Sequence, residues 1–196
     1  MTRKMMFYGV LALGLALGGS AVWTLTARAG YESAEYKVVE KDGNIEIREY
    51  PDLMLASTST KVDAQGREGS FMRLFGYISG ANQSEQKIAM TTPVFMTTGG
   101  DAKMSFVLPD KVAGEGAPSP KSSQLSVNAT TMGRVAVYRY SGKWNSQQRD
   151  AAREKLAAWL RDEGLSPEGE IFYAGYDPPY TPGFLRRNEV LVQVKS

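Results

Sequence analysis

The chain has 196 residues, of which 42% are hydrophobic and 22% charged, with 23 Lys and Arg against 21 Asp and Glu. This composition is typical of an ordinary globular protein and excludes the disordered and collagen-like classes. Histidine and cysteine are both absent. Their absence excludes disulfides, His/Cys zinc sites, histidine-dependent nucleophilic triads and histidine-ligated haem.

The N-terminus has the pattern of an export segment. Arg3 and Lys4 form a short basic start, and an apolar run covers residues 5–25. A basic start followed by an apolar run is typical of a signal peptide. The run has 21 residues, which is also enough to cross a bilayer with a hydrocarbon core about 30 Å thick. A cleaved signal peptide and an N-terminal membrane anchor both remain open.

Small residues mark the end of this segment. Ala27 and Ala29 stand three and one positions before a cleavage point at the end of residues 1–29, as signal peptidase requires. If the segment stays in place, its basic end remains cytoplasmic. Either outcome places the domain of residues 31–196 outside the inner membrane. We therefore expect a periplasmic or other extracytoplasmic protein, tethered by residues 5–25 if the segment is not removed.

The charge of the domain argues against a nucleic-acid partner. Removal of residues 1–29 takes away three basic residues and no acidic ones, so the remaining domain is nearly neutral. Its one pair of adjacent basic residues is Arg186-Arg187, whereas a protein that binds the phosphate backbone carries a basic stripe. We expect no nucleic acid to bind.

The first half of the domain, residues 31–110, begins with a predicted hairpin. Apolar and polar residues alternate on both sides of Asp42-Gly43, and this pattern predicts two paired strands. Apolar residues then recur with the spacing i, i+3, i+4, i+7, which predicts a helical face that ends at Gly80. The predicted elements are strands at 36–40, 45–48 and 53–61, a helix whose apolar face is Phe71, Leu74, Phe75 and Ile78, and strands at 87–96 and 103–108.

The second half, residues 121–196, follows a loop at 110–121 that is rich in Gly, Pro and Ser. Its helix is the clearest element, because Asn145 or Ser146 can cap its start and Gly164 follows its end. The predicted elements are strands at 124–129 and 134–140, a helix at 146–163 with the core stripe Ala152, Leu156, Trp159 and Leu160, and strands at 170–176 and 189–195.

The two halves predict a duplicated ββαββ plan. Most strands alternate apolar and polar residues, which is typical of antiparallel sheets with one solvated face. The expected fold class is α+β: a curved, mainly antiparallel sheet or distorted barrel, flanked by two helices and preceded by the N-terminal export or anchor helix.

Six short stretches occur in a fixed order along the domain. They are IEIREYP at 45–51, FMRLFGYISGAN at 71–82, KIAMTTPV at 87–94, KMSFVLP at 103–109, GYDPP at 175–179 and RRNEV at 186–190. Together they resemble the SOUL haem-binding protein family over nearly all of residues 31–196. The resemblance implies a distorted barrel of two repeated halves with two flanking helices. It also implies that haem or another tetrapyrrole binds in an open hydrophobic groove near the first helix.

Aromatic and basic residues near the first helix and before the last strand suit such a groove. A flat apolar ring can stack on apolar side chains, and arginines can pair with the propionates. Any axial bond to iron must come from Met or Tyr, and Met72, Met90, Tyr173, Tyr176 and Tyr180 are equal candidates, so the metal ligand stays unassigned. The predicted binding residues are Phe71, Met72, Phe75, Tyr180 and Phe184, with Arg67, Arg73, Arg186 and Arg187 for the propionates.

Simpler interpretations exist for the same residues. Leu74 and Ile78 are expected in the core, Arg186-Arg187 can form local ion pairs at a strand end, and 176–180 can be a rigid turn. No nucleotide-binding glycine motif or catalytic spacing is present, so we expect no enzyme.

The predicted function is a tetrapyrrole-binding module for carriage, buffering or sensing. The alternatives are a binder of a lipid, quinone or other apolar molecule, and a groove that receives a helix of an unknown protein partner.

Overall fold

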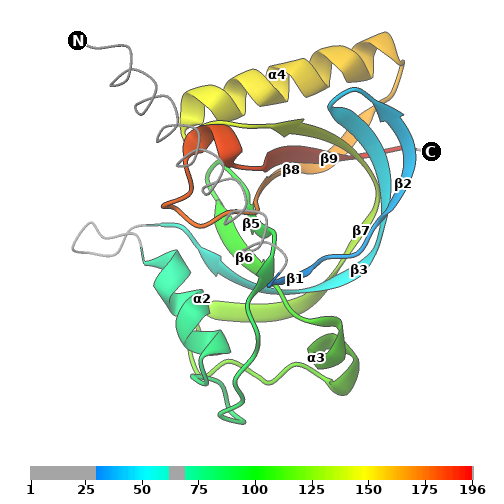
Figure 1. Ribbon diagram of the computed structural model, residues 1–196. Helices are drawn as coiled ribbons and strands as arrows, with labels where there is room; N and C mark the ends of the chain where they lie inside the picture. Colours follow the sequence, from blue (N-terminus) through cyan, green and yellow to red (C-terminus); the bar gives the residue numbers. More distant parts are fainter. Residues whose placement is uncertain (1–29, 62–68, 196) are drawn as a thin grey trace, which may run out of the picture.

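Two long strands form the centre of the sheet. In the computed structural model, which describes residues 30–61 and 69–195, β3 (Ile45–Ser59) pairs antiparallel with β7 (Leu125–Tyr140) along most of its length. The other side of β3 pairs first with β2 (Lys37–Asp42) and then with β6 (Lys103–Val107). One strand therefore holds three neighbours and joins both halves of the chain (Figure 1).

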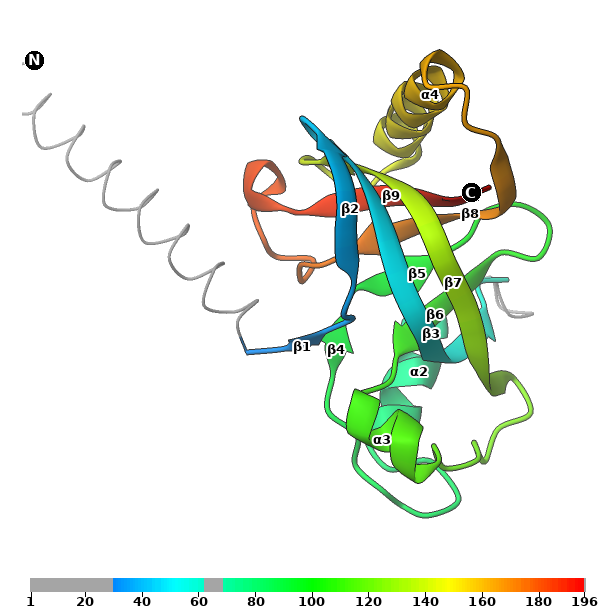
Figure 2. The same cartoon turned by 90° about the vertical axis from the view of Figure 1, so that its right-hand side faces the viewer.

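The remaining strands close the sheet into a curved ring. β5 (Val94–Met96) pairs with β6, β8 (Pro167–Gly175) pairs with β5, and β9 (Asn188–Val194) connects β8 to β7. The described residues thus form a seven-stranded, antiparallel sheet whose pairings return to β3 (Figure 2). A separate parallel pair joins β1 (Glu32–Ser33) to β4 (Thr91–Thr92).

Helices pack on the outside of this ring. α2 (Ser70–Ile78) lies against β3 and β6, α3 (Asp110–Glu115) lies near α2, and α4 (Ser146–Asp162) covers β7 and β9 (Figure 1). A short 3₁₀ turn, η1 (Gly183–Leu185), lies in the loop between β8 and β9. The α+β class and the mainly antiparallel, curved sheet are confirmed. No helix within residues 30–61 and 69–195 is long and apolar enough to span a membrane. The predicted export or anchor helix lies outside the described residues.

Alternation along the strands separates the core into an inner and an outer part. Val135 and Val137 of β7 belong to the cluster inside the ring, whereas Ala136 between them packs under α4. Leu191 and Val190 of β9 divide in the same way. This two-residue period lets one sheet bury both faces, one against itself and one against the helices.

The predicted hairpin and both predicted helices are present. Gly43 turns the β2–β3 hairpin with a φ of 54°, a conformation that glycine adopts without strain. The side chain of Asn145 caps α4 by accepting a 2.9 Å hydrogen bond from the backbone N–H of Gln148. Of the predicted stripe on α4, Ala152, Leu156 and Leu160 are buried. The fourth member, Trp159, is partly buried and donates a hydrogen bond to Asp42.

The predicted breaks at 49–52 and 130–133 are wrong. β3 runs through Pro51, which lies between the segment paired with β2 and the segment paired with β6. One side of the strand has no ladder partner there, so a residue without an N–H is tolerated. β7 likewise runs through Gly133, at a φ of 56°, while its pairing with β3 continues. The second half therefore reads β-α-β-β and does not repeat ββαββ.

Two further segments differ from their predictions. The predicted loop at 110–121 begins with α3, because Val112 is buried among the core residues beneath α2. The predicted strand at 87–96 is shorter, since its first residues run along the end of α2. There the N–H of Ile88 donates a 2.8 Å hydrogen bond to the carbonyl of Ile78. Tertiary packing decides both segments against the local pattern.

Replacement of the α4 cap tests how much the best-predicted element contributes. We expect Asn145→Ala to lower the free energy of unfolding by about 1 kcal/mol, because the N–H of Gln148 loses its acceptor. Urea denaturation followed by circular dichroism measures this change. Asn145→Asp retains an acceptor and should stay close to the original protein. Equal losses in both variants would contradict the assigned role of the cap.

Candidate functional site

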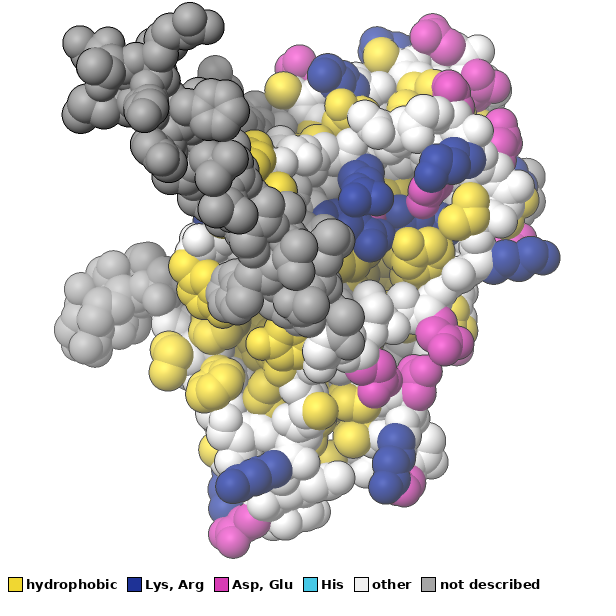
Figure 3. Space-filling model, in the orientation of Figure 1, with side chains coloured by type: hydrophobic (Ala, Val, Ile, Leu, Met, Phe, Trp, Pro, Cys, Tyr) yellow, Lys and Arg dark blue, Asp and Glu magenta, His cyan; other side chains and the backbone are white. Residues whose placement is uncertain are grey.

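The site is an apolar groove on the outer face of the sheet, between α2 and the loop that joins β8 to β9. It consists of two adjoining hollows of about 240 Å³ and about 290 Å³. Hydrophobic side chains gather over α2 on this face of the molecule (Figure 3). The residues that line both hollows are Phe71, Val94, Gly175, Asp177 and Pro179.

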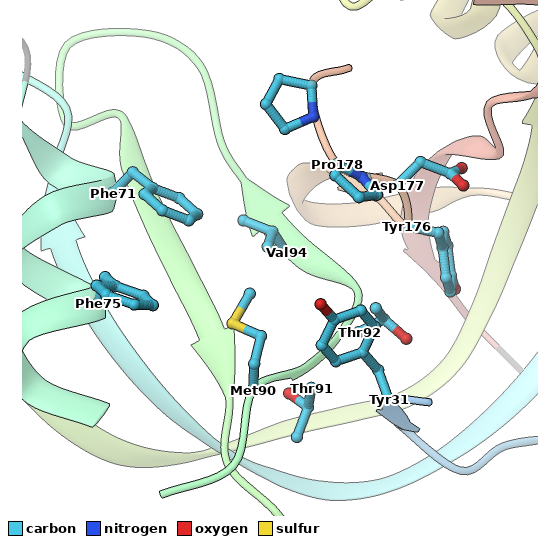
Figure 4. Close-up of a pocket in the computed structure, with 12 residues that line it drawn as sticks. Tyr31, Phe71, Phe75, Met90, Thr91, Thr92, Val94, Tyr176, Asp177 and Pro178 are labelled. Atoms are coloured by element: carbon cyan, nitrogen blue, oxygen red, sulfur yellow. The ribbon is translucent and has the colours of Figure 1, made fainter. Parts of the chain in front are cut away.

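One wall of the groove is the exposed side of α2. Leu74, Tyr77 and Ile78 point into the core, so the same helix turns Phe71 and Phe75 outward. Each phenylalanine is 44% exposed, and their rings stack with centroids 6.1 Å apart. Both rings project from α2 toward Met90 and Val94 (Figure 4). Nine helical residues therefore supply a buried face and an aromatic wall.

The opposite wall is the segment Tyr176–Pro179 at the end of β8. The carboxylate of Asp177 accepts a 2.6 Å hydrogen bond from the backbone N–H of Arg187. The guanidinium of Arg187 lies 3.8 Å from the centre of the Tyr176 ring. The Tyr176 hydroxyl donates to the carboxylate of Glu189 at 2.9 Å. These contacts fix the turn across from α2 (Figure 4).

Behind this wall lies a buried ionic network inside the ring. Glu189 has no exposed surface and accepts two hydrogen bonds from the guanidinium of Arg48, at 2.8 and 2.9 Å. The Arg187 guanidinium binds the same carboxylate at 2.7 Å. Arg48 also pairs with Glu46, so the two arginines face two carboxylates. The exposed Lys41 also binds Glu46, so the charges balance among the buried and partly buried groups, as burial requires.

Within the network, the pKa of Glu189 is lowered and that of Tyr176 is raised. Burial alone would raise the pKa of Glu189, but the hydrogen bonds and charges of Arg48 and Arg187 outweigh it and hold that pKa below its usual range. Burial raises the pKa of Tyr176 well above its usual value, and the negative charge of Glu189 adds to this effect. Glu189 is therefore ionised at neutral pH and Tyr176 keeps its proton.

The predicted binding residues occupy three kinds of position. Phe71 and Phe75 line the groove, and Arg186 lines the larger hollow. The guanidinium of Arg186 also donates to the backbone carbonyls of Thr181 and Pro179. The other described members do not line either hollow: Met72, Tyr180 and Phe184 are exposed, Arg73 binds Thr58 and the Ser59 carbonyl, and Arg187 belongs to the ionic network. Arg67 lies outside the described residues.

Several lining residues escaped the sequence analysis. Tyr31 directly precedes β1 and Thr92 belongs to its partner β4, while Met96, Met104 and Trp144 line the larger hollow. Gly175 forms part of the floor. A Cβ atom added at Gly175 would lie 3.6 Å from the Trp144 ring, which is an ordinary van der Waals contact, so the fold has room for a side chain there. The stretches KIAMTTPV and GYDPP contain part of this set, and their order along the chain was the available signal.

The candidate iron ligands separate by position. Met90 lines the groove, whereas the Tyr176 hydroxyl is bound to Glu189 and Tyr173 is buried under α4. Met72 and Tyr180 are exposed outside the lining. Within the described part of the chain, no group of three or more His, Cys, Asp or Glu residues is placed to hold a metal ion.

These features define a class: an α+β protein with a curved antiparallel ring and an open apolar groove that suits a flat ligand. The sequence profile of the SOUL heme-binding proteins matches residues 31–193. The chain therefore belongs to the SOUL heme-binding protein family.

Individual proteins show the same relationship. Heme-binding protein 2 of Mus musculus is 30% identical over 166 residues, which cover 79% of this chain and 80% of that protein. Heme-binding protein 1 of Xenopus tropicalis is 30% identical over 180 residues, which cover 82% and 91%. A crystal structure of an uncharacterized conserved protein from Listeria innocua matches with a TM-score of 0.56 at 13% identity, covering 78% of this chain and 92% of that one. This last similarity concerns the fold alone.

Removal of the central carboxylate tests the network. We expect Glu189→Gln to lower the free energy of unfolding by about 3 kcal/mol at neutral pH, because two buried guanidinium groups lose their shared counter-charge. A carboxylate with a lowered folded-state pKa stabilises the protein above its unfolded pKa of about 4.3, and this contribution is lost as the pH falls through the folded value. The difference between the two proteins should therefore be largest above about pH 4.3 and shrink as the pH falls below it in urea titrations.

The exposed residue Glu154 supplies the control for this measurement. Glu154→Gln should change the free energy of unfolding by less than about 0.5 kcal/mol at any of these pH values. A Glu189→Gln effect that is small at neutral pH, or that does not depend on pH, would contradict the ionised state assigned to Glu189.

Proposed function

We propose that the protein binds haem or a related tetrapyrrole in the groove, without a histidine ligand, and acts in carriage, buffering or sensing. The observation that carries the proposal is the open apolar groove, with Phe71 and Phe75 on one wall and Met90 and Val94 on its floor. Relatives named as heme-binding proteins support it. We propose a binding role and no catalytic one.

The groove offers enough apolar surface for useful affinity. A tetrapyrrole that buries about 400 Å² of apolar surface at about 25 cal/mol/Å² gains on the order of 10 kcal/mol before the costs of association. Those costs reduce the net affinity to the micromolar range or somewhat better. The two adjoining hollows together reach the usual size of small-molecule sites, roughly 300–1,000 Å³. Apolar contact alone is therefore sufficient.

Polar groups at the groove orient the ligand in this proposal. Among the described residues that line the larger hollow, Arg186 is the one basic residue, so it would pair with a propionate. The sulfur-bearing side chains in the lining are Met90, Met96 and Met104. When bound, haem supplies an iron centre that accepts axial ligands. The chain contains no imidazole for that purpose.

We also propose that residues 1–29 export the domain, either as a signal peptide or as an uncleaved anchor. The basic start, the apolar run at 5–25 and the alanines before residue 30 support this. The site of action would then be the periplasm or another extracytoplasmic space.

Filling the groove from its floor tests the proposed site directly. We expect Gly175→Val and Phe71→Asp each to weaken haem binding at least about tenfold, the first by occupying the floor and the second by placing a charge in the wall. Titration of haem into the purified protein, followed by the Soret band, measures the affinity. Circular dichroism verifies that each variant is folded.

Val39→Asp is the matched control, because Val39 is an exposed apolar residue of β2 that lines neither hollow. This variant should bind haem as the original protein does. If all three variants bind equally, haem occupies another surface and the proposed site is wrong.

A second prediction concerns the role of iron. Since apolar contact supplies the affinity, iron-free protoporphyrin IX should bind within about tenfold of haem. Competition titrations, with haem displaced by protoporphyrin IX, give the ratio of the two dissociation constants. A preference for haem of about a thousandfold would indicate a strong axial bond and would contradict the proposed mode.

A lipid or quinone is the alternative ligand, and the apolar lining together with the missing histidine favours it. Organic extraction of the protein purified from its native source, followed by mass spectrometry, separates the two. A copurified tetrapyrrole supports the first proposal, and an isoprenoid or acyl lipid without tetrapyrrole supports the second.

A further inference from the structure

The groove lies where the domain leaves its N-terminal segment. Tyr31, the second described residue, is part of the lining. The next residues are fixed to the groove wall, because β1 pairs with β4 and the N–H of Ala34 donates a 2.9 Å hydrogen bond to the carbonyl of Thr92. The side chains of Ser33 and Thr92 are also hydrogen-bonded. Any tether formed by residues 5–25 is therefore attached at the rim of the groove.

The connection between that tether and the rim is short. Five residues lie between Leu25, the end of the apolar run, and Tyr31, so six Cα-to-Cα steps join the two. At about 3.3–3.6 Å per extended residue, they span at most roughly 20 Å. If residues 5–25 cross the bilayer, the mouth of the groove stays close to the membrane surface.

Exposed apolar side chains stand on both sides of the mouth. Met72 on α2 is 66% exposed, and Tyr180 and Phe184 in the β8–β9 loop are 67% and 63% exposed. The partly exposed Phe71 and Phe75 continue this surface into the groove. Single exposed apolar residues are normal, but a cluster around a ligand site indicates an interaction surface. We call these five residues the apolar rim.

Charge is nearly absent from the parts of the two segments that carry the rim, and the flanking Asp177 and Arg186 are bound to backbone groups. Residues 178–185 contain no charged side chain. On α2 the one charged residue is Arg73, and its guanidinium donates to the Thr58 hydroxyl and the Ser59 carbonyl. A surface of this composition gains little from the charge of lipid headgroups, but its aromatic and apolar side chains can enter the interfacial region.

We propose that the apolar rim docks on the lipid bilayer to which residues 5–25 tether the domain, so that the groove opens toward the membrane. An apolar ligand can then pass between bilayer and groove without crossing water. This inference rests on the proposed function and on the proposed anchor. It commits to lipid as the contact, against a second copy of the chain or a partner protein.

Single cysteines test the contact, since the chain has none of its own. The full-length chain, synthesised without signal peptidase in the presence of phosphatidylethanolamine and phosphatidylglycerol vesicles, carries a fluorophore at Met72→Cys or at Phe184→Cys. The control label is at Asp162→Cys, an exposed position at the C-terminal end of α4. Two rim positions on different elements are used so that one misfolded variant does not decide the result. Circular dichroism verifies each fold.

Spin-labelled lipids should quench both rim labels severalfold more strongly than the control label, and added salt should change this little. Equal, weak quenching at all three positions would overturn the proposal, because the apolar rim would then not contact the lipid bilayer. A rim label that is unquenched but shifts its emission as the protein density rises would also overturn it and indicate a second copy.

Haem titration of the same vesicles separates this inference from the proposed function. Protein that binds haem while its rim labels are not quenched keeps the proposed function and overturns membrane docking. Rim quenching without haem binding supports docking and overturns the proposed ligand.

Discussion

The carboxylate of Glu189 joins β3 to the loop that forms one wall of the groove. It lies inside the ring between Arg48 of β3 and Arg187 in the loop before β9, and all of its hydrogen bonds come from buried or partly buried groups. An ion this deep is stable only when its partners replace the water that it has lost. Arg48 and Arg187 provide that replacement, and they can do so only if β3 and β9 are held in one arrangement.

This constraint extends to the surface. Arg187 holds Asp177 through its backbone and Tyr176 through its guanidinium, so the position of the wall follows from the position of the buried ion. α2 is placed independently, by Leu74, Tyr77 and Ile78 against the outer face of the sheet. The groove is the space left between two elements that are each anchored to the ring but do not need each other. A site built in this way is present before any ligand binds.

The elements that the sequence predicts well are those whose signals are local. Asn145, the stripe on α4 and Asp42-Gly43 act within a few residues, and the structure agrees with them. Pro51 and Gly133 are also local turn signals, yet long-range pairing between β3 and β7 outweighs both. The positions of Phe71 and Phe75 in the groove could be predicted because α2 has more apolar side chains than one buried face requires. The opposite wall could not be predicted, since Tyr176–Pro179 comes to lie across the groove from α2 only in the folded chain.

Part of the ionic network can be predicted from the alternation of residues along β3 and β9. Glu189 shares a face of β9 with Leu191, and Arg48 shares a face of β3 with Tyr50, so the two-residue period places both charges on an inner face. A buried position for opposite charges on two strands predicts that they pair. Arg187 could not be assigned in this way, because it precedes the strand and its neighbour Arg186 turns to the groove instead.

If the groove holds the proposed ligand, its openness determines how long that ligand stays bound. Its aromatic wall is half-exposed, and nothing in the described residues closes over the mouth. Exposed side chains change rotamer within nanoseconds, so escape needs no movement of the sheet. With micromolar affinity and an ordinary association rate of about 10⁶ M⁻¹s⁻¹, a bound molecule would depart about once per second. Such a short residence time suits transfer between partners and is poorly suited to long-term storage.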